Sequence, residues 1–339
     1  MKAKRIYVIF MAVVVLSLTA LPVAAADIPP ELCDYMARLA IGKLYVPYYE
    51  IEKNEAPKEE YVTIDPSPDQ YTEEAMDTED ESEIPDGAIA VQAVNLSRYE
   101  EGDIPPLLLV NETDYKADLP TLTQSYTGKG GAVLILHTHG TEAYLPDGVD
   151  YYREEEDFRS TDKAETVVAA GEAFAEKLRE AGIEVFHDET MYDAASFTDA
   201  YTASRNGARE WLKKHPQIRY IFDIHRDAVS REGASCKTLC QGQEKPTAQV
   251  MLVIGTNEAG ANHPDWRSNL SLAASYQREL NRFPTLARPV YLRRASFNQQ
   301  LSPGYMLLEV GSAANTLSEA KNAAILAAEC FVKLYFNQK

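Results

Sequence analysis

Residues 133–144 read Val-Leu-Ile-Leu-His-Thr-His-Gly-Thr-Glu-Ala-Tyr, an apolar run that ends in two histidines and a glutamate. Four consecutive apolar residues followed by polar ones are typical of a buried strand. The whole chain has six histidines, so two at the end of one strand are a marked concentration. Imidazole and carboxylate are the ligands of a catalytic zinc, which keeps one position open for water. The stretch therefore predicts a metal site; alternatively, the histidines only cap the strand and bond to nearby backbone.

Strands and helices alternate along the chain from Gly131 onward. Strands are predicted at 133–137, 183–186, 218–224, 248–254 and 306–310, and helices at 163–181, 199–214, 268–281 and 321–335. This alternation indicates an α/β fold, a three-layer sandwich with a largely parallel central sheet flanked by helices. Residues 105–110 are expected to form an edge strand that leads into this domain.

Polar residues stand at the carboxyl ends of several predicted strands, where α/β sheets place their ligand sites. His137, His225 and Glu309 all fall there, so we expect them to converge. His225 lies in Asp223-Ile-His-Arg-Asp227. An aspartate there could fix its tautomer, as carboxylates that accept the other ring N–H do for metal-bound histidines. Read alone, the same residues could form only a surface ion pair between Arg226 and Asp227.

Glu309 stands between apolar residues in Leu-Leu-Glu-Val-Gly-Ser. Burial at a strand end would raise the pKa of this carboxyl, which suits a group that must both accept and donate a proton. Alternatively, it is an ordinary half-buried strand glutamate. His215 and His263 are expected at the surface.

Charge and the amino terminus exclude some classes of function. The formal net charge of −19 argues against binding nucleic acid, because phosphates would be repelled. Lys2, Lys4 and Arg5 precede an apolar run that continues to Ala26. This arrangement is typical of a secretory signal, and its length also suits an uncleaved membrane anchor. Either way, we expect the rest of the chain to be extracytoplasmic, membrane-anchored or secreted.

Composition divides the chain into five parts. The segment 49–87 is strongly acidic and rich in proline, so it is expected to be a disordered linker. The predicted parts are a signal peptide or membrane anchor at 1–26, a short helical segment at 27–48, the acidic disordered linker at 49–87, a lead-in segment at 88–130 and a catalytic domain at 131–339.

Four cysteines do not describe a disulfide scaffold. Cys236 and Cys240 lie four residues apart in what reads as a loop, so a local disulfide is plausible there. Cys33 and Cys330 are isolated and are interpreted as structural.

Several separate motifs, in this order, resemble the stage II sporulation protein P family of spore-forming Gram-positive bacteria. The resemblance covers about residues 105–335. The motifs are His-Thr-His-Gly-Thr-Glu-Ala-Tyr at 137–144, Asp-Ile-His-Arg-Asp at 223–227, Ala-Gln-Val-Met-Leu-Val-Ile-Gly at 248–255, Asp-Trp-Arg-Ser-Asn-Leu at 265–270, Phe-Asn-Gln-Gln-Leu-Ser-Pro at 297–303 and Leu-Glu-Val-Gly-Ser at 308–312 with the nearby Asn315-Thr316. The amino-terminal hydrophobic segment and acidic linker also look like that family's membrane anchor and spacer.

The resemblance implies a zinc amidase-like fold and a zinc-dependent N-acetylmuramoyl-L-alanine amidase of peptidoglycan. Such an enzyme cuts the amide between N-acetylmuramic acid and L-alanine of the stem peptide. It also implies a role in septal wall remodelling and forespore engulfment beside the lytic transglycosylase stage II sporulation protein D and membrane partner proteins. A stem-peptide or cross-link metallo-endopeptidase and a catalytically idle cell-wall scaffold are the alternatives.

The resemblance also implies the residues of the site. The metal ligands would be His137 or His139, together with Glu142 and His225, and Glu309 would be the catalytic glutamate. Because His137 and His139 would lie on the same side of an extended chain, spacing cannot choose between them, and the family pattern slightly favours His137. Four further candidates have weaker support: Glu165 as a reserve metal ligand, Arg226 as a residue that meets substrate carboxylates or holds Glu309, and Asn298 and Gln299 as substrate-binding or turn-stabilising residues.

Overall fold

The computed structural model describes residues 61–64, 84–97, 107–115 and 130–337. From Lys58 onward the chain forms one compact unit. The predicted signal or anchor segment and the short helix at 27–48 lie outside the described residues. None of the helices that the structure describes is long and apolar enough to cross a membrane.

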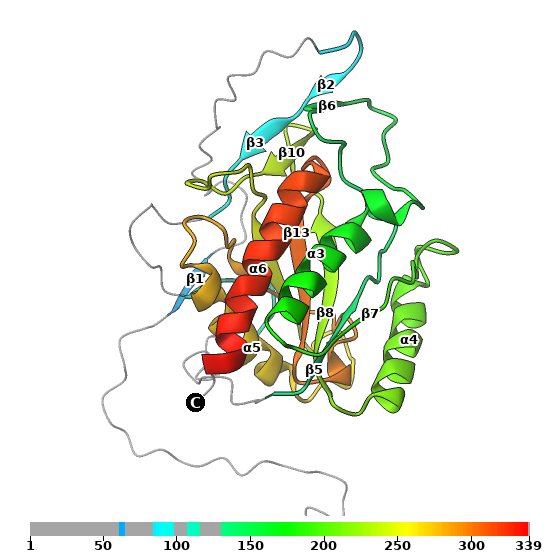
Figure 1. Cartoon of the computed structure of the whole chain (residues 1–339), viewed down its shortest axis with the longest axis vertical. Helices are drawn as coiled ribbons and strands as arrows, with labels where there is room; N and C mark the ends of the chain where they lie inside the picture. The colour runs from blue at the N-terminus through cyan, green and yellow to red at the C-terminus, as the bar shows by residue number, and fades with distance from the viewer. Residues whose placement is uncertain (1–60, 65–83, 98–106, 116–129, 338–339) are drawn as a thin grey trace, which may run out of the picture. The chain divides into compact units, whose positions relative to one another are not determined.

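An eight-stranded sheet forms the centre of this unit (Figure 1). Its strands, in spatial order, are β1 (Tyr61–Ile64), β4 (Leu107–Asn111), β12 (Val290–Arg293), β11 (Val250–Gly255), β13 (Tyr305–Ser312), β8 (Ile218–Asp227), β5 (Ala132–Leu136) and β7 (Val185–His187). Neighbouring strands are parallel except β11 and β13, which are antiparallel. The prediction of a largely parallel sheet is confirmed, and the sheet consists of two parallel halves that run in opposite directions.

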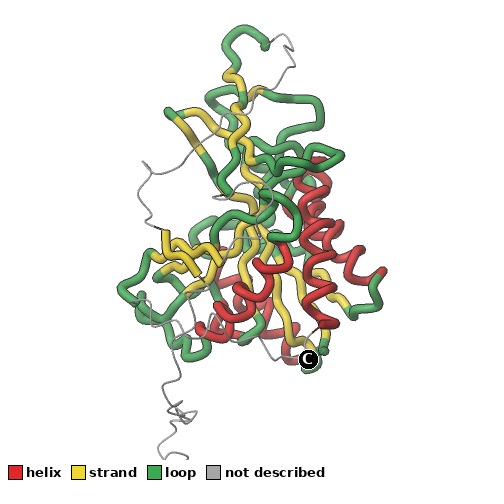
Figure 2. The backbone as a smooth tube through the Cα atoms, turned by 90° about the vertical axis from the view of Figure 1, so that its left-hand side faces the viewer, coloured by secondary structure: helices red, strands yellow, loops and turns green. Residues whose placement is uncertain are grey.

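Helices cover both faces of the sheet, which makes the three predicted layers. On one face, α3 (Val167–Glu180), α5 (Trp266–Leu280) and α6 (Leu317–Asn337) pack on the main hydrophobic core. α4 (Ala200–Lys214) packs on the opposite face through a smaller cluster. In Figure 1, α3 and α6 lie side by side across the strands, and Figure 2 shows the strands as a layer with helices beside it.

The alternation of side chains along β5 explains how the strand serves both layers. Val133 and Ile135 belong to the core beneath α3, whereas Ala132, Leu134 and Leu136 belong to the cluster beneath α4. All five are fully buried, as expected for a strand covered on both faces. The run of apolar residues at 132–136 therefore reflects burial on both sides.

Helix α3 begins and ends at recognisable signals. The predicted helix at 163–181 opens with a short 3-10 turn, η3 (Lys163–Glu165), and the Thr166 hydroxyl then accepts a hydrogen bond from the Val168 amide. Gly182 follows the helix with a φ of 81°, a conformation that a residue without Cβ adopts easily. The helix thus starts four residues later than predicted.

Segments before the predicted catalytic domain contribute strands. The strand predicted at 105–110 is β4, but it is not an edge strand, because Tyr61–Ile64, inside the predicted disordered linker, forms β1 and pairs with its outer side. A three-stranded sheet joins β3 (Gln92–Val94), β10 (Ala234–Thr238) and β9 (Ser230–Arg231), and a two-stranded one joins β2 (Ile89–Ala90) and β6 (Tyr151–Tyr152). The lead-in segment is therefore built into the same unit as the rest.

The predicted disulfide between Cys236 and Cys240 is wrong. Cys240 has a free thiol, which donates to the Pro284 carbonyl at 3.0 Å. Cys236 lies in β10 and not in a loop. Four residues of extended chain separate two Cα atoms by about 13 Å, and a disulfide needs less than about 7 Å.

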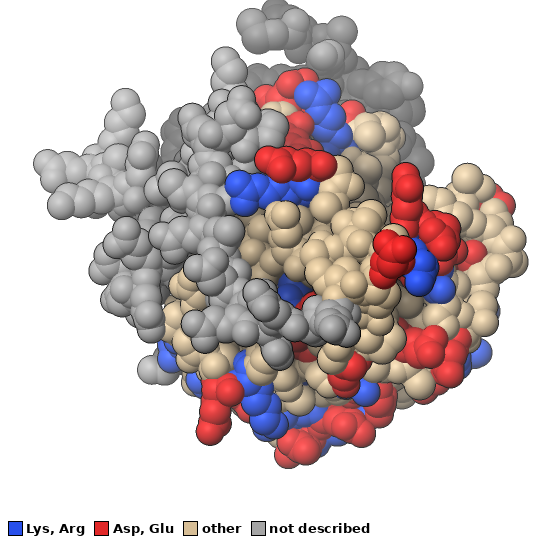
Figure 3. Space-filling view, turned by 90° about the horizontal axis from the view of Figure 1, so that it is seen from above, with Lys and Arg blue, Asp and Glu red and all other residues tan. Residues whose placement is uncertain are grey.

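Charge on the described surface is mixed. The face seen from above in Figure 3 carries Asp and Glu side chains interspersed with Lys and Arg, without a broad basic patch among the residues drawn in colour.

Candidate active site

The carboxyl ends of β5, β8 and β13 meet at one edge of the sheet. The three strands are adjacent and parallel, so the residues at their ends lie side by side. Glu309 is the register partner of His225 across β13 and β8, and both side chains face the α4 side of the sheet. Of the three strand-end residues expected to converge, His225 and Glu309 are thus direct neighbours.

A turn after β5 sends the two histidines of the first motif to opposite faces. Residues 138–141 form a turn, closed by a hydrogen bond from the Glu142 amide to the His139 carbonyl at 3.0 Å. The expectation that His137 and His139 share one side of an extended chain is therefore wrong. His137 continues the alternation of β5 toward α3, where its ring lies against Gly171, while His139 lies on the α4 side.

His137 is fully buried and held away from the strand-end cluster. Its Nδ1 lies 2.9 Å from the Ile224 carbonyl and its Nε2 lies 2.9 Å from Nε2 of His187. Burial, with the neighbouring His187, lowers the pKa of His137 to about 3, so the ring is neutral. Because a carbonyl only accepts, Nδ1 carries the proton and Nε2 presents a lone pair to His187. The structure does not place His137 beside Glu142.

His139 forms part of the cluster that contains His225. The two ring centroids lie 5.4 Å apart, and the face of His139 stacks on Phe197 at 4.5 Å. Tyr201 of α4 meets its edge at 5.5 Å. Nδ1 of His139 is 3.7 Å from the Asp193 carboxylate and has no hydrogen-bond partner in the described part of the chain.

Two carboxylates flank His225. Its Nδ1 lies 3.5 Å from Oε2 of Glu142, and its Nε2 lies 2.9 Å from Oδ1 of Asp223. Burial alone would lower the pKa of His225, but Asp223 and Glu142 raise it well above its ordinary value. Asp223 is itself fixed, because the amide and hydroxyl of Thr138 donate to it at 2.8 and 2.6 Å. The site is therefore arranged to hold positive charge at His225.

Glu309 lies just before an irregularity in β13. The register with β8 shifts between Glu309 and Ser312, and Gly311 there has a φ of 67°. Such bulges re-aim side chains next to active sites. Burial raises the pKa of Glu309 to about 8, and repulsion from Asp227 acts in the same direction. Its Oε2 is buried and has no hydrogen-bond partner among the described residues.

One pair of donors in this cluster has the spacing of zinc ligands. Two ligands about 2.1 Å from a tetrahedral zinc lie about 3.4 Å apart, and Nδ1 of His225 is 3.5 Å from Glu142 Oε2. Oδ1 of Asp223 lies 2.9 Å from Nε2, on the side where a carboxylate orients a metal-bound histidine, although the two atoms are not aligned for a hydrogen bond. Buried polar atoms without partners are uncommon, yet His139 Nδ1 and Glu309 Oε2 are both in this state within one cluster.

Arg226 holds backbone and not Glu309. Its guanidinium donates to the carbonyls of Ala143 and Phe158 at 3.3 and 3.0 Å, and its amide donates to Glu142. Since neighbouring residues of a strand point to opposite faces, Arg226 points away from the side shared by His225 and Glu309. The structure therefore corrects its predicted role: Arg226 fastens the segment that carries Glu142.

Asn298 and Gln299 are buried parts of the fold. Asn298 has a φ of 59° and donates to the Tyr201 carbonyl at 2.7 Å. Gln299 accepts from the Gly255 amide and donates to the Val253 carbonyl, at 2.9 and 2.8 Å. Both side chains stabilise turns, the alternative role stated above, and substrate binding by them is not supported.

Two other predicted positions differ from expectation. Glu165 is exposed on η3, and its carboxylate accepts from the Ser160 hydroxyl at 2.7 Å, so the structure shows no contact between this reserve ligand and the cluster. His263 is not a surface residue: it is 1% exposed, and burial lowers its pKa to about 4. A single histidine in a Pro- and Asn-containing loop carries no sequence signal for such burial.

Three residues of the site carry no signal in the sequence. Asp193, Phe197 and Tyr201 come from the segment that leads into α4 and from its first turn. Asp193 accepts from the amide and hydroxyl of Thr141, and His139 and Thr141 outweigh burial to lower the pKa of Asp193 to about 2. Only the packing of α4 against the ends of β5 and β8 brings these side chains to His139.

Comparisons with known proteins place the chain in a family. A family model described as stage II sporulation protein P matches residues 36–332. Stage II sporulation protein P of Bacillus subtilis (strain 168) is 28% identical over 223 residues, which cover 62% of this chain and 53% of that protein. The matched region thus spans about half the length of this relative.

Solved structures resemble the fold only weakly. N-acetylmuramoyl-L-alanine amidase AmiC2 of Nostoc punctiforme has a TM-score of 0.37 and 11% identity, over 62% of this chain and 97% of that one. An N-acetylmuramoyl-L-alanine amidase from Clostridium difficile 630 has a TM-score of 0.36 and 13% identity, over 62% of this chain and all of that one (100%).

Proposed function

Because the chain belongs to the stage II sporulation protein P family, we propose that it is a zinc-dependent N-acetylmuramoyl-L-alanine amidase of peptidoglycan. It would hydrolyse the amide between the lactyl group of N-acetylmuramic acid and L-alanine of the stem peptide. The single observation that carries this proposal is the cluster of His139, Glu142, His225 and Glu309 at the carboxyl edge of three adjacent strands.

Two imidazoles and one carboxylate would hold the metal: His139, Glu142 and His225. Zinc held by three such ligands keeps a position for water or substrate, polarises a carbonyl and makes water a better nucleophile near neutral pH. The protein contributes the fixed orientation of these ligands. Asp223 sets the ring of His225, and Arg226 fixes the backbone beside Glu142.

Glu309 would move the proton. Its unpartnered Oε2 accepts a proton from the attacking water and returns it to the departing alanine nitrogen. A carboxyl with a pKa raised to about 8 is suited to hold that proton between the two steps. Positive charge bound beside His225 would lower this value toward neutrality, where transfer in both directions is efficient.

An aromatic surface beside His139 would receive the substrate. Phe197 is 57% exposed although it stacks on His139, and the Arg159 guanidinium lies 4.8 Å from its ring centre. Sugar rings and their lactyl substituents pack on such faces. The Arg159 guanidinium donates to Asp193 and to Thr141, both at 2.8 Å, so it holds this surface in place. The exposed ring of Phe197 supports a peptidoglycan fragment as the ligand.

The proposal includes a cellular setting. The enzyme would act outside the cytoplasm, anchored or secreted through residues 1–26, on wall material remodelled during septation and engulfment. A lytic transglycosylase of the stage II sporulation protein D type would be its natural companion, since one enzyme removes stem peptides and the other cuts the glycan. Family membership supports this setting.

The test is digestion of purified peptidoglycan by the zinc-loaded full chain, followed by mass spectrometry. We expect stem peptides with a free alanine amino group and muramic acid with a free lactyl carboxyl. Replacing Glu309 by Gln should lower the rate by about 10²–10⁴-fold, because the proton carrier is lost. Absence of released stem peptides with zinc confirmed bound would refute the amidase.

Two matched controls sharpen this test. Glu142→Gln should lose zinc and activity together, whereas Glu165→Gln, an exposed glutamate in the same part of the chain, should retain both. If muramic acid still carries alanine while peptides are cut further along, the chain is the metallo-endopeptidase. If neither bond is cut, it is an idle wall-binding protein.

A further inference from the structure

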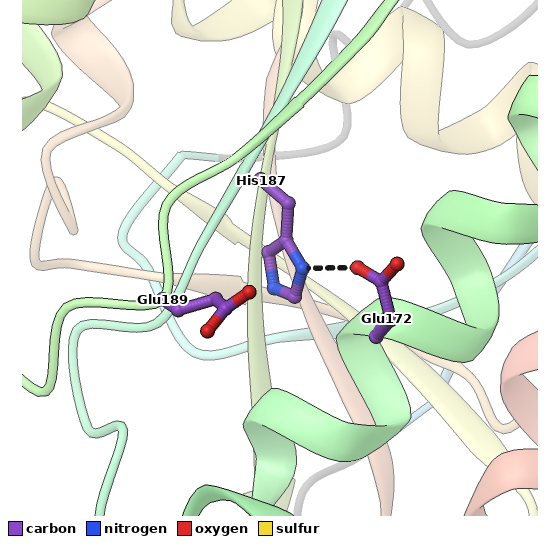
Figure 4. A group of neighbouring side chains, drawn as sticks. All are labelled: Glu172, His187 and Glu189. Atoms are coloured by element: carbon purple, nitrogen blue, oxygen red, sulfur yellow. Dashed lines mark hydrogen bonds and ion pairs between the residues drawn. The ribbon is translucent and has the colours of Figure 1, made fainter.

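A second group of metal-binding side chains lies on the α3 side of the sheet. It comprises Glu172 of α3, His187 at the end of β7, and Glu189 just beyond it. One ligand atom from each of the three lies within 4.8 Å of the others. Figure 4 shows both carboxylates directed at the imidazole, Glu172 from the helix and Glu189 from the opposite side.

His187 has a partner at each ring nitrogen. Its Nδ1 lies 2.7 Å from Oε2 of Glu172, and its Nε2 lies 2.9 Å from Nε2 of His137. The ring is therefore held between α3 and the fully buried His137, with Nδ1 directed at the carboxylate of Glu172.

Each carboxylate already pairs with one basic side chain through one oxygen. Glu172 Oε1 lies 2.7 Å from Arg179, and Glu189 Oε2 lies 3.1 Å from Lys163. An ion would therefore bind at the other oxygens, of which Oε2 of Glu172 lies 2.7 Å from Nδ1 of His187. The side chain of His187 is only 3% exposed, so a positive charge there would be partly desolvated and needs both carboxylates.

We propose that Glu172, His187 and Glu189 form a second divalent-cation site. This site would bind Zn²⁺ and so link α3 to the end of β7. One imidazole and two carboxylates are a set that zinc accepts. His187 would bind through Nδ1, and its Nε2–H would donate to His137, as metal-bound histidines donate their other ring N–H to a fixed acceptor. The ion would be structural, because this group lies on the face of the sheet opposite His139 and Glu309.

Zinc stoichiometry of the full chain tests this site. After chelation and dialysis against Zn²⁺ alone, the double variant Glu172→Gln/Glu189→Gln should bind about one zinc fewer per chain than the unchanged protein. Zinc should also raise the melting temperature less in this variant, because a bound ion stabilises only the folded state. Glu176→Gln, one turn further along α3 and exposed, is the matched control and should change neither quantity.

The two metal sites can be separated. In a His225→Ala background, which removes the proposed catalytic ion, the chain should keep about one zinc, and the double variant should then remove it. If the catalytic proposal fails, the unchanged chain binds about one zinc and the Glu172→Gln/Glu189→Gln chain none. Equal stoichiometry in the double variant and the unchanged chain overturns the second site.

A measurement on the unchanged chain tests the site without depending on variants that fail to fold. In ¹⁵N-labelled protein, zinc should shift Nδ1 of His187 strongly while Nε2 keeps its proton. A His187 ring whose nitrogen signals do not respond to zinc would also overturn the proposal.

Discussion

Two regions of the molecule start from histidines only two residues apart and have opposite properties. His139 lies on the α4 side beside an exposed aromatic ring, with Nδ1 unpartnered and carboxylates nearby. His137 lies on the α3 side, fully buried, with both ring nitrogens engaged. The turn at 138–141 makes the difference, since it reverses the face that the chain presents. An open donor set and a closed one can thus arise from a single motif.

The largest effect should separate these two histidines. His139→Ala should lose the proposed catalytic zinc and lower amidase activity by at least about 10²-fold, because a ligand is gone. His137→Ala should keep activity within about tenfold and lower the free energy of unfolding by about 2 kcal/mol, because a buried ring and its hydrogen bonds are lost.

The measurements are zinc content, peptide release and urea unfolding of both variants. If His137→Ala loses zinc and activity while His139→Ala keeps both, the assignment of the two regions is reversed. His139→Gln serves as a milder control, since it keeps a polar side chain of similar reach but lacks the imidazole.

A smaller effect is expected from adding one methyl group to α3. Gly171 has no side chain because a Cβ there would come within 2.4 Å of His137 Cε1 and 2.7 Å of its Nε2. Gly171→Ala should therefore lower the free energy of unfolding by about 1–3 kcal/mol through overpacking. Amidase activity should change little, because the catalytic cluster faces the other side of the sheet.

Urea unfolding and peptide release again provide the measurement. Ala175→Gly, one turn along the same helix, is a useful contrast, because it tests helix loss without pressing on the two rings. Loss of activity in Gly171→Ala with unchanged stability would show that the α3 side transmits its strain to the catalytic edge.

The smallest effect is a loss of folding stability at acidic pH. His263 is buried with neither ring nitrogen bonded within the described chain, and burial lowers its pKa to about 4. The unfolded chain takes up this proton below about pH 6.5, while the folded chain does so only near pH 4. Stability present above pH 6.5 is therefore lost as the pH falls, by about 1–2 kcal/mol at pH 5.5.

His263→Phe should flatten that part of the stability curve, measured by urea unfolding between pH 7 and 5. The decrease in stability with falling pH that remains in this variant is then due to groups such as His137, whose pKa is lower still. An unchanged slope in the variant would contradict the neutral buried state of His263.

The sequence predicted the parts of this fold that depend on local pattern. The apolar runs at 133–136 and 306–308 identified two central strands, because strands covered on both faces show no polar alternation. β12 escaped prediction because Val290–Arg293 is short and is followed by a second arginine. β10 was not predicted because Ala234–Thr238 is largely polar, and because its longer pairing is with the distant β3 while its local partner β9 has only two residues.

The site was predictable where strand ends supply its residues. His225 and Glu309 follow from their place in the strands, since parallel neighbours end at one edge. The choice of His139 over His137 was not predictable, because it depends on a turn whose residues read equally well as extended chain. The prediction that Asn298 and Gln299 bind substrate failed for a related reason. Only tertiary packing shows that their side-chain amides form hydrogen bonds with backbone groups.

The antiparallel junction of β11 and β13 bears on the order in which the protein is made. β13 lies between the two halves of the sheet although it is the last strand in sequence, so a chain synthesised only as far as β12 exposes unpaired edges on both β8 and β11. Glu309 stands on that closing strand. The hydrolytic activity proposed for this site would therefore arise only after nearly all of the chain has emerged and the sheet has closed, so truncated or half-folded copies would not attack the wall.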